Sequence, residues 1–307
     1  MTAPGTVRCS EWARQVGLDP IGTIGSYRSY LVLDWPLPWP RDLSEVLALG
    51  ALGPALESAR CRLQGVVVPQ DVATRRLALY WSKGSEFTRY HRVERVVPVA
   101  EVGEAAAELL EGLAERQIED VATPDSREVL VCTHGRRDRC CGSLGTDLAL
   151  RLLADRPSLG AATRVGRTSH TGGHRFAPTA LVLPEGTAWA FADADLIRKV
   201  VTRQGSLTDL LPRYRGCAGL SSRSAQALER AVLGEMGWEL FDLARRGKDG
   251  DDGSARLEVS WPDGSMAEWE AEVGPGRKLP IPDCGASIAA AYKSETELVV
   301  KGLRRVR

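Results

Sequence analysis

A thiol-rich loop in the middle of the chain reads Val131-Cys132-Thr133-His134-Gly135-Arg136-Arg137-Asp138-Arg139-Cys140-Cys141-Gly142. Further along comes a second conspicuous stretch, His170-Thr171-Gly172-Gly173-His174. The chain has seven cysteines and four histidines, and three of each lie between Cys132 and His174. Thiol and imidazole groups gathered in this way are typical of a metal or cluster site.

The elements around these two stretches follow a recognisable order. A short strand precedes the thiol-rich loop and a helix follows it, and another strand leads to the histidines. A hairpin and a closing helix complete the region. The order of strand, helix, strand, hairpin and helix is typical of a thioredoxin-like fold. The expected ranges are Arg127–Val131, Gly142–Ala154, Ala162–Thr168, Thr179–Leu183 with Thr187–Phe191, and Ala194–Arg203.

The preceding part of the chain roughly repeats this order, so we expect an internal pseudo-duplication in which only the second copy carries ligands. Thr123-Pro124-Asp125-Ser126 has the composition of a linker between the copies. The expected elements are a strand at Ser29–Trp35, helical spacing over Asp42–Leu63 with breaks at Gly50 and Gly53, strands at Gly65–Val68, Arg76–Trp81 and Phe87–Val97, and a helix at Val102–Gln117.

The last hundred residues have a different character, with a helix, a polar glycine-rich loop and short strands. We expect Ser222–Gly237 to be the helix and Gly247–Ser254 to be a mobile loop. The sequence therefore predicts an α/β protein with three regions: 1–122 without ligands, 123–210 with the site, and a small α+β region at 211–307. The expected strands of the last region are Arg256–Trp261, Met266–Val273 and Glu297–Lys301.

Composition narrows the classes of function. The 40 basic and 40 acidic residues balance, so no net charge attracts nucleic acid or an anionic membrane. No apolar run approaches the roughly 18–20 residues of a membrane span, and no secretory signal is visible. We expect a cytoplasmic, reducing location, where clustered cysteines are more often ligands than disulfides. No glycine-rich dinucleotide fingerprint supports NAD(P) or flavin binding.

The residue chemistry leaves two kinds of site open for Cys132, Cys141, His170 and His174. Cys132 ends a strand and Cys141 precedes a helix, whose N-terminus offers free N–H groups to an anionic cluster. Two cysteines and two histidines also form a common tetrahedral zinc set, although the first cysteine pair of such sets is usually separated by two to four residues. Here eight residues lie between Cys132 and Cys141. The adjacent Cys140 and Cys141 could alternatively form a dithiol switch, but the chain lacks Cys-x-x-Cys at this junction.

Other residues near the site have simpler interpretations. The arginines of the loop either offset cluster charge and dock an acidic redox partner, or form a solvated basic loop. We expect His134 to lie in the surroundings of the site or at the surface, and His91 at the surface. The scattered cysteines are interpreted as small buried residues. The arginines are Arg136, Arg137 and Arg139, and these cysteines are Cys9, Cys61, Cys217 and Cys284.

The chain resembles the sucrase/ferredoxin-like family, whose members carry a thioredoxin-like ferredoxin domain. The resemblance rests on Cys132–Asp138, on Cys141-Gly142 and on His170–His174. It extends more weakly to Gly22-Thr23-Ile24, Leu31–Pro40 and Tyr214-Arg215-Gly216-Cys217. It implies a 2Fe–2S cluster with Cys132, Cys141, His170 and His174 as ligands, and it leaves open whether Cys140 or His134 can take a ligand position.

The resulting hypothesis is an electron carrier or redox component that works with a separate reductase or acceptor, rather than a stand-alone enzyme. The alternative is a zinc-stabilised structural or interaction module. Imidazole ligands leave a cluster less negative than thiolates would and raise its reduction potential. The name of the family mentions sucrase, but no pair of carboxylates in the sequence stands out for glycoside hydrolysis.

Overall fold

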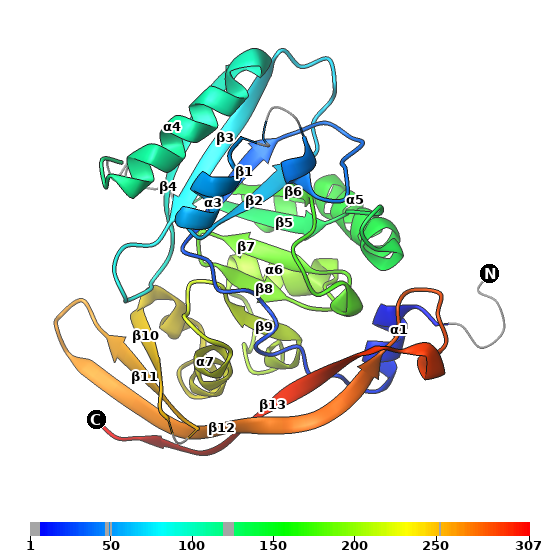
Figure 1. Ribbon diagram of the computed structural model, residues 1–307. Helices are drawn as coiled ribbons and strands as arrows, with labels where there is room; N and C mark the ends of the chain where they lie inside the picture. The colour runs from blue at the N-terminus through cyan, green and yellow to red at the C-terminus, as the bar shows by residue number, and fades with distance from the viewer. Residues whose placement is uncertain (1–6, 47–48, 50, 119–125, 252) are drawn as a thin grey trace.

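The computed structural model describes residues 7–46, 49, 51–118, 126–251 and 253–307, and it contains two β-sheets (Figure 1). The larger sheet has nine strands in the order β4-β3-β1-β2-β6-β5-β7-β8-β9. Its strands are β1 (Ser29–Asp34), β2 (Cys61–Val66), β3 (Thr74–Trp81), β4 (His91–Pro98), β5 (Arg127–Cys132), β6 (Thr163–Thr168), β7 (Ala180–Leu183), β8 (Thr187–Trp189) and β9 (Tyr214–Cys217).

The two halves of this sheet have the same strand order. In the first half β1 is parallel to β2 and antiparallel to β3, which pairs with β4. In the second half β5 is parallel to β6 and antiparallel to β7, which pairs with β8. The halves meet where β2 and β6 run antiparallel, through Val66 and Thr168. The predicted order of strand, helix, strand, hairpin and helix is confirmed in each half. The helices are α3 (Gly53–Ser58) and α4 (Val102–Ala114) in the first half, and α5 (Thr146–Ala154) and α6 (Ala194–Thr202) in the second.

Alternation along the strands explains how the sheet is covered on both faces. Leu31 and Leu33 of β1 pack into the cluster that includes α4, whereas Tyr30 and Val32 belong to the cluster on the other face. β5 does the same, since Val129 and Val131 pack against α5 and α6 while Leu130 faces the opposite way. Strands buried on both faces explain the nearly continuous apolar runs in the sequence.

The expectation of helical structure across Asp42–Leu63 is largely wrong. Among the described residues the structure has a 3₁₀ turn at Leu43–Glu45 and the short α3, and β2 begins at Cys61. Residues 47, 48 and 50 of that range lie outside the described residues. The same holds for residues 119–125, which include most of the linker predicted at 123–126. Arg60 has a positive φ of 44°, which ends the helical path, and parallel pairing with β1 then makes the following residues a strand.

The four-stranded sheet holds the C-terminal part of the chain. Its strands are antiparallel neighbours in sequence order: β10 (Ala244–Asp249), β11 (Ser254–Ser260), β12 (Met266–Ile281) and β13 (Lys293–Arg305). α7 (Arg223–Met236) contributes Ala227 and Leu228 to the same core as Ala255 and Leu257 of β11. β9 belongs to the larger sheet, so the predicted boundary after residue 210 falls just before a strand of that sheet.

The expected mobile loop at Gly247–Ser254 is narrower than predicted, because the first three residues belong to β10 and Ser254 belongs to β11. Residues up to Asp249 pair with β11, and the described turn between the two strands is held by Gly250 N–H donating to Ser254 O at 2.8 Å. Gly247 serves close packing, because a Cβ there would lie 2.3 Å from Cβ of Ala225 in α7. The predicted strands of β12 and β13 are also longer in the structure than their predicted ranges.

The hairpin of β12 and β13 reaches back to the start of the described chain (Figure 1). Its end lies beside α1 (Cys9–Gln15), where Trp12 Nε1 donates to Pro280 O at 3.0 Å. The connecting loop bonds to Val7, since Val7 N–H donates to Ala286 O and Gly285 N–H donates to Val7 O. This arrangement brings α1 and the loop between β12 and β13 to the thiol-rich loop. No helix among the described residues is long and apolar enough to span a bilayer.

Candidate metal centre

Three of the four predicted ligands lie together at one edge of the large sheet. Cys132 is the last residue of β5, and His170 follows the end of β6. Because β5 and β6 are parallel neighbours, their carboxyl ends meet at the same edge. Cys132 Sγ lies 3.8 Å from His170 Nδ1, and the ligand atoms of Cys132, Cys141 and His170 all lie within 4.8 Å of one another.

The helix that carries Cys141 begins earlier than predicted. Helical structure starts at Arg139 rather than at Gly142, and a π-helical turn spans Cys141–Gly145 before α5 begins. Such turns are rare and occur frequently at functional sites. Two glycines allow this turn to pack on the thiol-rich loop. A Cβ at Gly145 would lie 1.9 Å from Cys132 O, and one at Gly142 would lie 2.5 Å from Gly135 Cα.

His174 lies beside this group, but its ring contacts Asp138 and Cys9. It begins a 3₁₀ turn after Gly172 and Gly173, whose φ angles of 83° and 69° favour glycine. His174 Nδ1 is 2.9 Å from Asp138 Oδ2 and 3.4 Å from Cys9 Sγ. The rings of His170 and His174 have centroids 6.4 Å apart. A neutral ring that donates its Nδ1 proton to Asp138 leaves Nε2 as its free nitrogen.

A buried arginine, Arg215, and a partly buried one, Arg62, hold the backbone of the histidine loop. Arg215 donates to Gly172 O at 3.2 Å and to Thr23 O at 2.8 Å, and Arg62 donates to His170 O. A Cβ at Gly173 would lie 2.3 Å from Arg215 Nη2, so a glycine is required there. Burial lowers the pKa of Arg215 to about 10, while attraction to Cys132 opposes that effect. Arg215 therefore remains a cation at neutral pH within electrostatic reach of Cys132.

Cys132 is the most acidic thiol of its group. A hydrogen bond from Cys141 holds the pKa of Cys132 well below its usual range, and the neighbouring His170 adds to this effect. The same hydrogen bond, together with burial, raises the pKa of Cys141. The thiolate is the form of cysteine that binds metals, so a metal held by this pair would meet Cys132 as the more acidic thiol and would displace the proton of Cys141.

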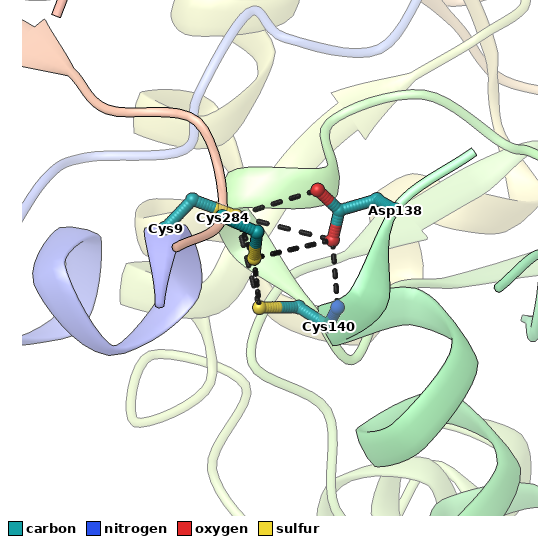
Figure 2. Close-up of side chains that lie close together, drawn as sticks. All are labelled: Cys9, Asp138, Cys140 and Cys284. Atoms are coloured by element: carbon teal, nitrogen blue, oxygen red, sulfur yellow. Dashed lines mark hydrogen bonds between the residues drawn. The ribbon is translucent and has the colours of Figure 1, made fainter. Parts of the chain in front are cut away.

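A second thiol group lies next to the first and was not predicted. Cys9 and Cys284 were expected to be scattered small residues, but they meet Cys140 and Asp138 in space (Figure 2). Hydrogen bonds from Cys284 and Cys9 hold the pKa of Cys140 well below its usual range. Sequence spacing carries no signal for this group, because Cys9 and Cys284 come from opposite ends of the chain. The remaining cysteines stay apart from both groups, in β2 and β9. Cys217 is buried as expected, whereas Cys61, like Cys284, is only partly buried.

His134 is buried and both of its ring nitrogens have partners in the backbone. Nε2 donates to Pro40 O at 2.9 Å, and Nδ1 accepts from Arg137 N–H at 3.2 Å. Desolvation lowers the pKa of His134, which favours the neutral ring. With both nitrogens occupied, His134 supports the loop and is not placed to be a spare ligand. His91 is only partly exposed and packs against Trp81, with ring centroids 5.6 Å apart.

The arginines of the loop point outward. Arg136, Arg137 and Arg139 are all exposed, and the first two donate to the carbonyl oxygens of Trp39 and Arg41. A cavity of about 300 Å³ opens between this loop and the ring of His170, with Arg62 and Arg137 in its lining. His170 is therefore the predicted ligand that borders a basic, solvent-accessible cavity.

The fold is a mixed α/β structure with a thiol–imidazole group that could hold a metal ion beside the ends of two strands. The family model described as sucrase/ferredoxin-like matches residues 20–216, which is more than half of the chain. The chain belongs to this sucrase/ferredoxin-like family. Comparison with curated proteins and with solved structures yields no match.

Proposed function

We propose that this protein is an electron-transfer component that binds a 2Fe–2S cluster through Cys132, Cys141, His170 and His174. The observation that carries the proposal is the grouping of the ligand atoms of Cys132, Cys141 and His170 within 4.8 Å at the ends of β5 and β6. His174 stands in the adjoining turn. Two thiolates and two imidazoles are a donor set that iron–sulfur centres use.

The bound cluster would supply one-electron chemistry, and the residues around it would set its potential. Neutral imidazoles favour the reduced state relative to an all-thiolate centre, and the buried cation of Arg215 acts in the same direction. Asp138 accepts the Nδ1 proton of His174 and so orients Nε2 for coordination. The alternative metal for the same residues is a zinc ion that stabilises the loop structure.

We further propose that each half of the large sheet is a thioredoxin-like unit and that the two units arose by duplication. The repeated strand order, β2-β1-β3-β4 and β6-β5-β7-β8, supports this proposal. So does the equivalent placement of α3 and α5 between the parallel strands, and of α4 and α6 after the hairpins. Among the described residues, the group that combines cysteines with a histidine consists of Cys132, Cys141 and His170, and all three belong to the second unit.

The proposed partner is a separate redox protein with an acidic docking surface, in the reducing cytoplasm. The exposed Arg136, Arg137 and Arg139 lie on the loop between the cluster ligands, and the basic cavity reaches His170. Opposite charges would steer such a partner to the edge of the sheet where electrons enter or leave.

The decisive experiment is metal and sulfide analysis of anaerobically purified protein, combined with EPR of the reduced sample. We expect two irons and two acid-labile sulfides per chain and an EPR signal from the reduced cluster. A colourless protein that contains zinc at Cys132 but neither iron nor sulfide would overturn the electron-transfer proposal in favour of the zinc module. His174→Ala is expected to change the visible spectrum, and an unchanged spectrum would remove His174 from the ligand set.

A further inference from the structure

The second thiol group has the composition and compactness of a metal site of its own. Cys140 Sγ lies 2.9 Å from Cys284 Sγ and 3.7 Å from Cys9 Sγ, and the last two sulfurs are 3.4 Å apart. Asp138 Oδ1 is 3.7 Å from Cys284 Sγ, and Oδ2 is 3.7 Å from Cys9 Sγ (Figure 2). All three cysteines are free thiols in the structure.

Two of the three sulfur separations, 3.7 and 3.4 Å, are close to those that a small tetrahedral ion requires, and the 2.9 Å pair would open by about 0.9 Å on binding. Zinc binds sulfur at about 2.3 Å, which places the sulfurs of a tetrahedral site about 3.8 Å apart. Three cysteines and one carboxylate supply four donors, and zinc accepts both kinds. We propose that Cys9, Asp138, Cys140 and Cys284 form a zinc site. It is separate from the proposed cluster site, whose ligands are Cys132, Cys141, His170 and His174.

The two sites can be filled together because they share no donor residue. Cys140 and Cys141 follow one another in a helical segment, where successive side chains point about 100° apart, so each serves a different group. Asp138 lies between the second thiol group and His174. Its Oδ1 faces Cys284, and its Oδ2 accepts from Nδ1 of His174 at 2.9 Å.

The role we assign to the zinc ion is structural. Its ligands come from α1, from the thiol-rich loop and from the loop between β12 and β13, which are far apart in the chain. Cys9 and Cys140 are buried and the Asp138 side chain is only 7% exposed, whereas Cys284 is partly exposed and provides a path for entry. Zinc would tie α1 and the loop between β12 and β13 to the thiol-rich loop, and it would hold Asp138 in place against His174.

The test is zinc, iron and sulfide content of the full-length protein, purified without chelators and with thiols protected. We expect about one zinc per chain beside the iron. Cys9→Ser and Cys284→Ser should each lower zinc at least tenfold and retain iron, while Cys132→Ser should lose iron and retain zinc. Cys61→Ser is the matched control and should retain both, because Cys61 lies in β2 outside the two groups.

A cobalt titration keeps the proposal testable if the site variants fold poorly. Co²⁺ added to zinc-depleted Cys132→Ser protein should produce the strong thiolate-to-cobalt absorption of a site with three sulfurs. Wild-type protein without zinc but with a Cys140–Cys284 disulfide, identified by peptide mapping, would overturn the proposal. Zinc that persists in both Cys9→Ser and Cys284→Ser, or that is lost in Cys132→Ser, would also overturn the proposal. Four irons per chain that fall to two in Cys284→Ser would overturn it as well, because they would indicate a second iron–sulfur cluster in place of zinc. Absence of iron with zinc present as expected would reject only the cluster.

Discussion

Cys140 and Cys141 are adjacent in the chain, yet their sulfurs belong to different groups. Cys140 Sγ contacts Cys284 at 2.9 Å, whereas Cys141 shares a group with Cys132 and His170. The turn of the helical backbone separates the two side chains. The pair is therefore better explained by two neighbouring sites than by a vicinal dithiol, and this division can be tested directly.

The first prediction separates the two cysteines by substitution. Cys141→Ser is expected to abolish the visible spectrum and EPR signal of the cluster, because it removes a proposed ligand. Cys140→Ser is expected to keep both, since its sulfur faces Cys9 and Cys284. Circular dichroism of both variants controls for folding. Loss of the cluster in Cys140→Ser with retention in Cys141→Ser would reverse the ligand assignment.

Substitution of a histidine ligand should change the reduction potential. His170→Cys is expected to keep a cluster and to lower its potential by on the order of 100–300 mV, because a thiolate adds negative charge that the imidazole lacks. Protein-film voltammetry measures the change. His91→Cys, in β4, is the control and should leave the potential unaltered. An unchanged potential in His170→Cys would argue against ligation by His170.

Arg215 should influence both the stability and the potential of the site. Arg215→Met removes the donors to Gly172 O and Thr23 O, and an unpaired buried carbonyl costs about 1–3 kcal/mol. Loss of the cation should also lower the potential, on the order of 50 mV for about 1 kcal/mol of lost attraction. Arg215→Lys is the control, since it retains the charge but not the full set of bonds. Equal potentials in the Met variant and the wild type would exclude an electrostatic role.

A buried ion pair joins α7 to the second sheet. Glu229 and Arg245 are fully buried, 2.9 Å apart, and Glu229 also accepts from Tyr214 Oη at 2.8 Å. Glu229→Ala should destabilise the protein by about 3–5 kcal/mol, because it leaves the Arg245 charge without a partner. Chemical denaturation measures the loss. The double variant Glu229→Ala/Arg245→Met should recover part of it, and a double variant as unstable as the sum of both single variants would show that the pair is not coupled.

Cys61 should make stability depend on alkaline pH. Burial raises the pKa of the Cys61 thiol from 9.0 to about 11. Between pH 9 and 11 the unfolded thiol ionises before the folded one, so this group's contribution to stability declines as pH rises, by at most about 1.4 kcal/mol per pH unit. Cys61→Ser should show a smaller decline than wild type in urea melts over this range. Parallel curves for the two proteins would contradict the assignment.

Much of the fold was predictable because its signals are local. Alternating or continuous apolar runs at Ser29–Trp35 and Arg76–Trp81, and the amphipathic pattern of Val102–Gln117, correspond to β1, β3 and α4 with small shifts at their ends. The same patterns misled where packing outweighed local preference. Pairing with β1 makes the end of Asp42–Leu63 the strand β2, and pairing with β11 places Gly247 in β10.

The sequence by itself determined most of the element order and the proximity of Cys132, Cys141 and His170. Cys132 and His170 stand at or just after the ends of two parallel neighbouring strands, which meet at the same side of the sheet, and Cys141 lies in the helical segment that follows the first of them. Only the tertiary structure decided which side chains Cys140 and His174 contact. Cys9 and Cys284 reach them through the packing of α1 on the β12–β13 hairpin, and contacts between segments so distant in sequence leave no periodic or spacing signal in the chain.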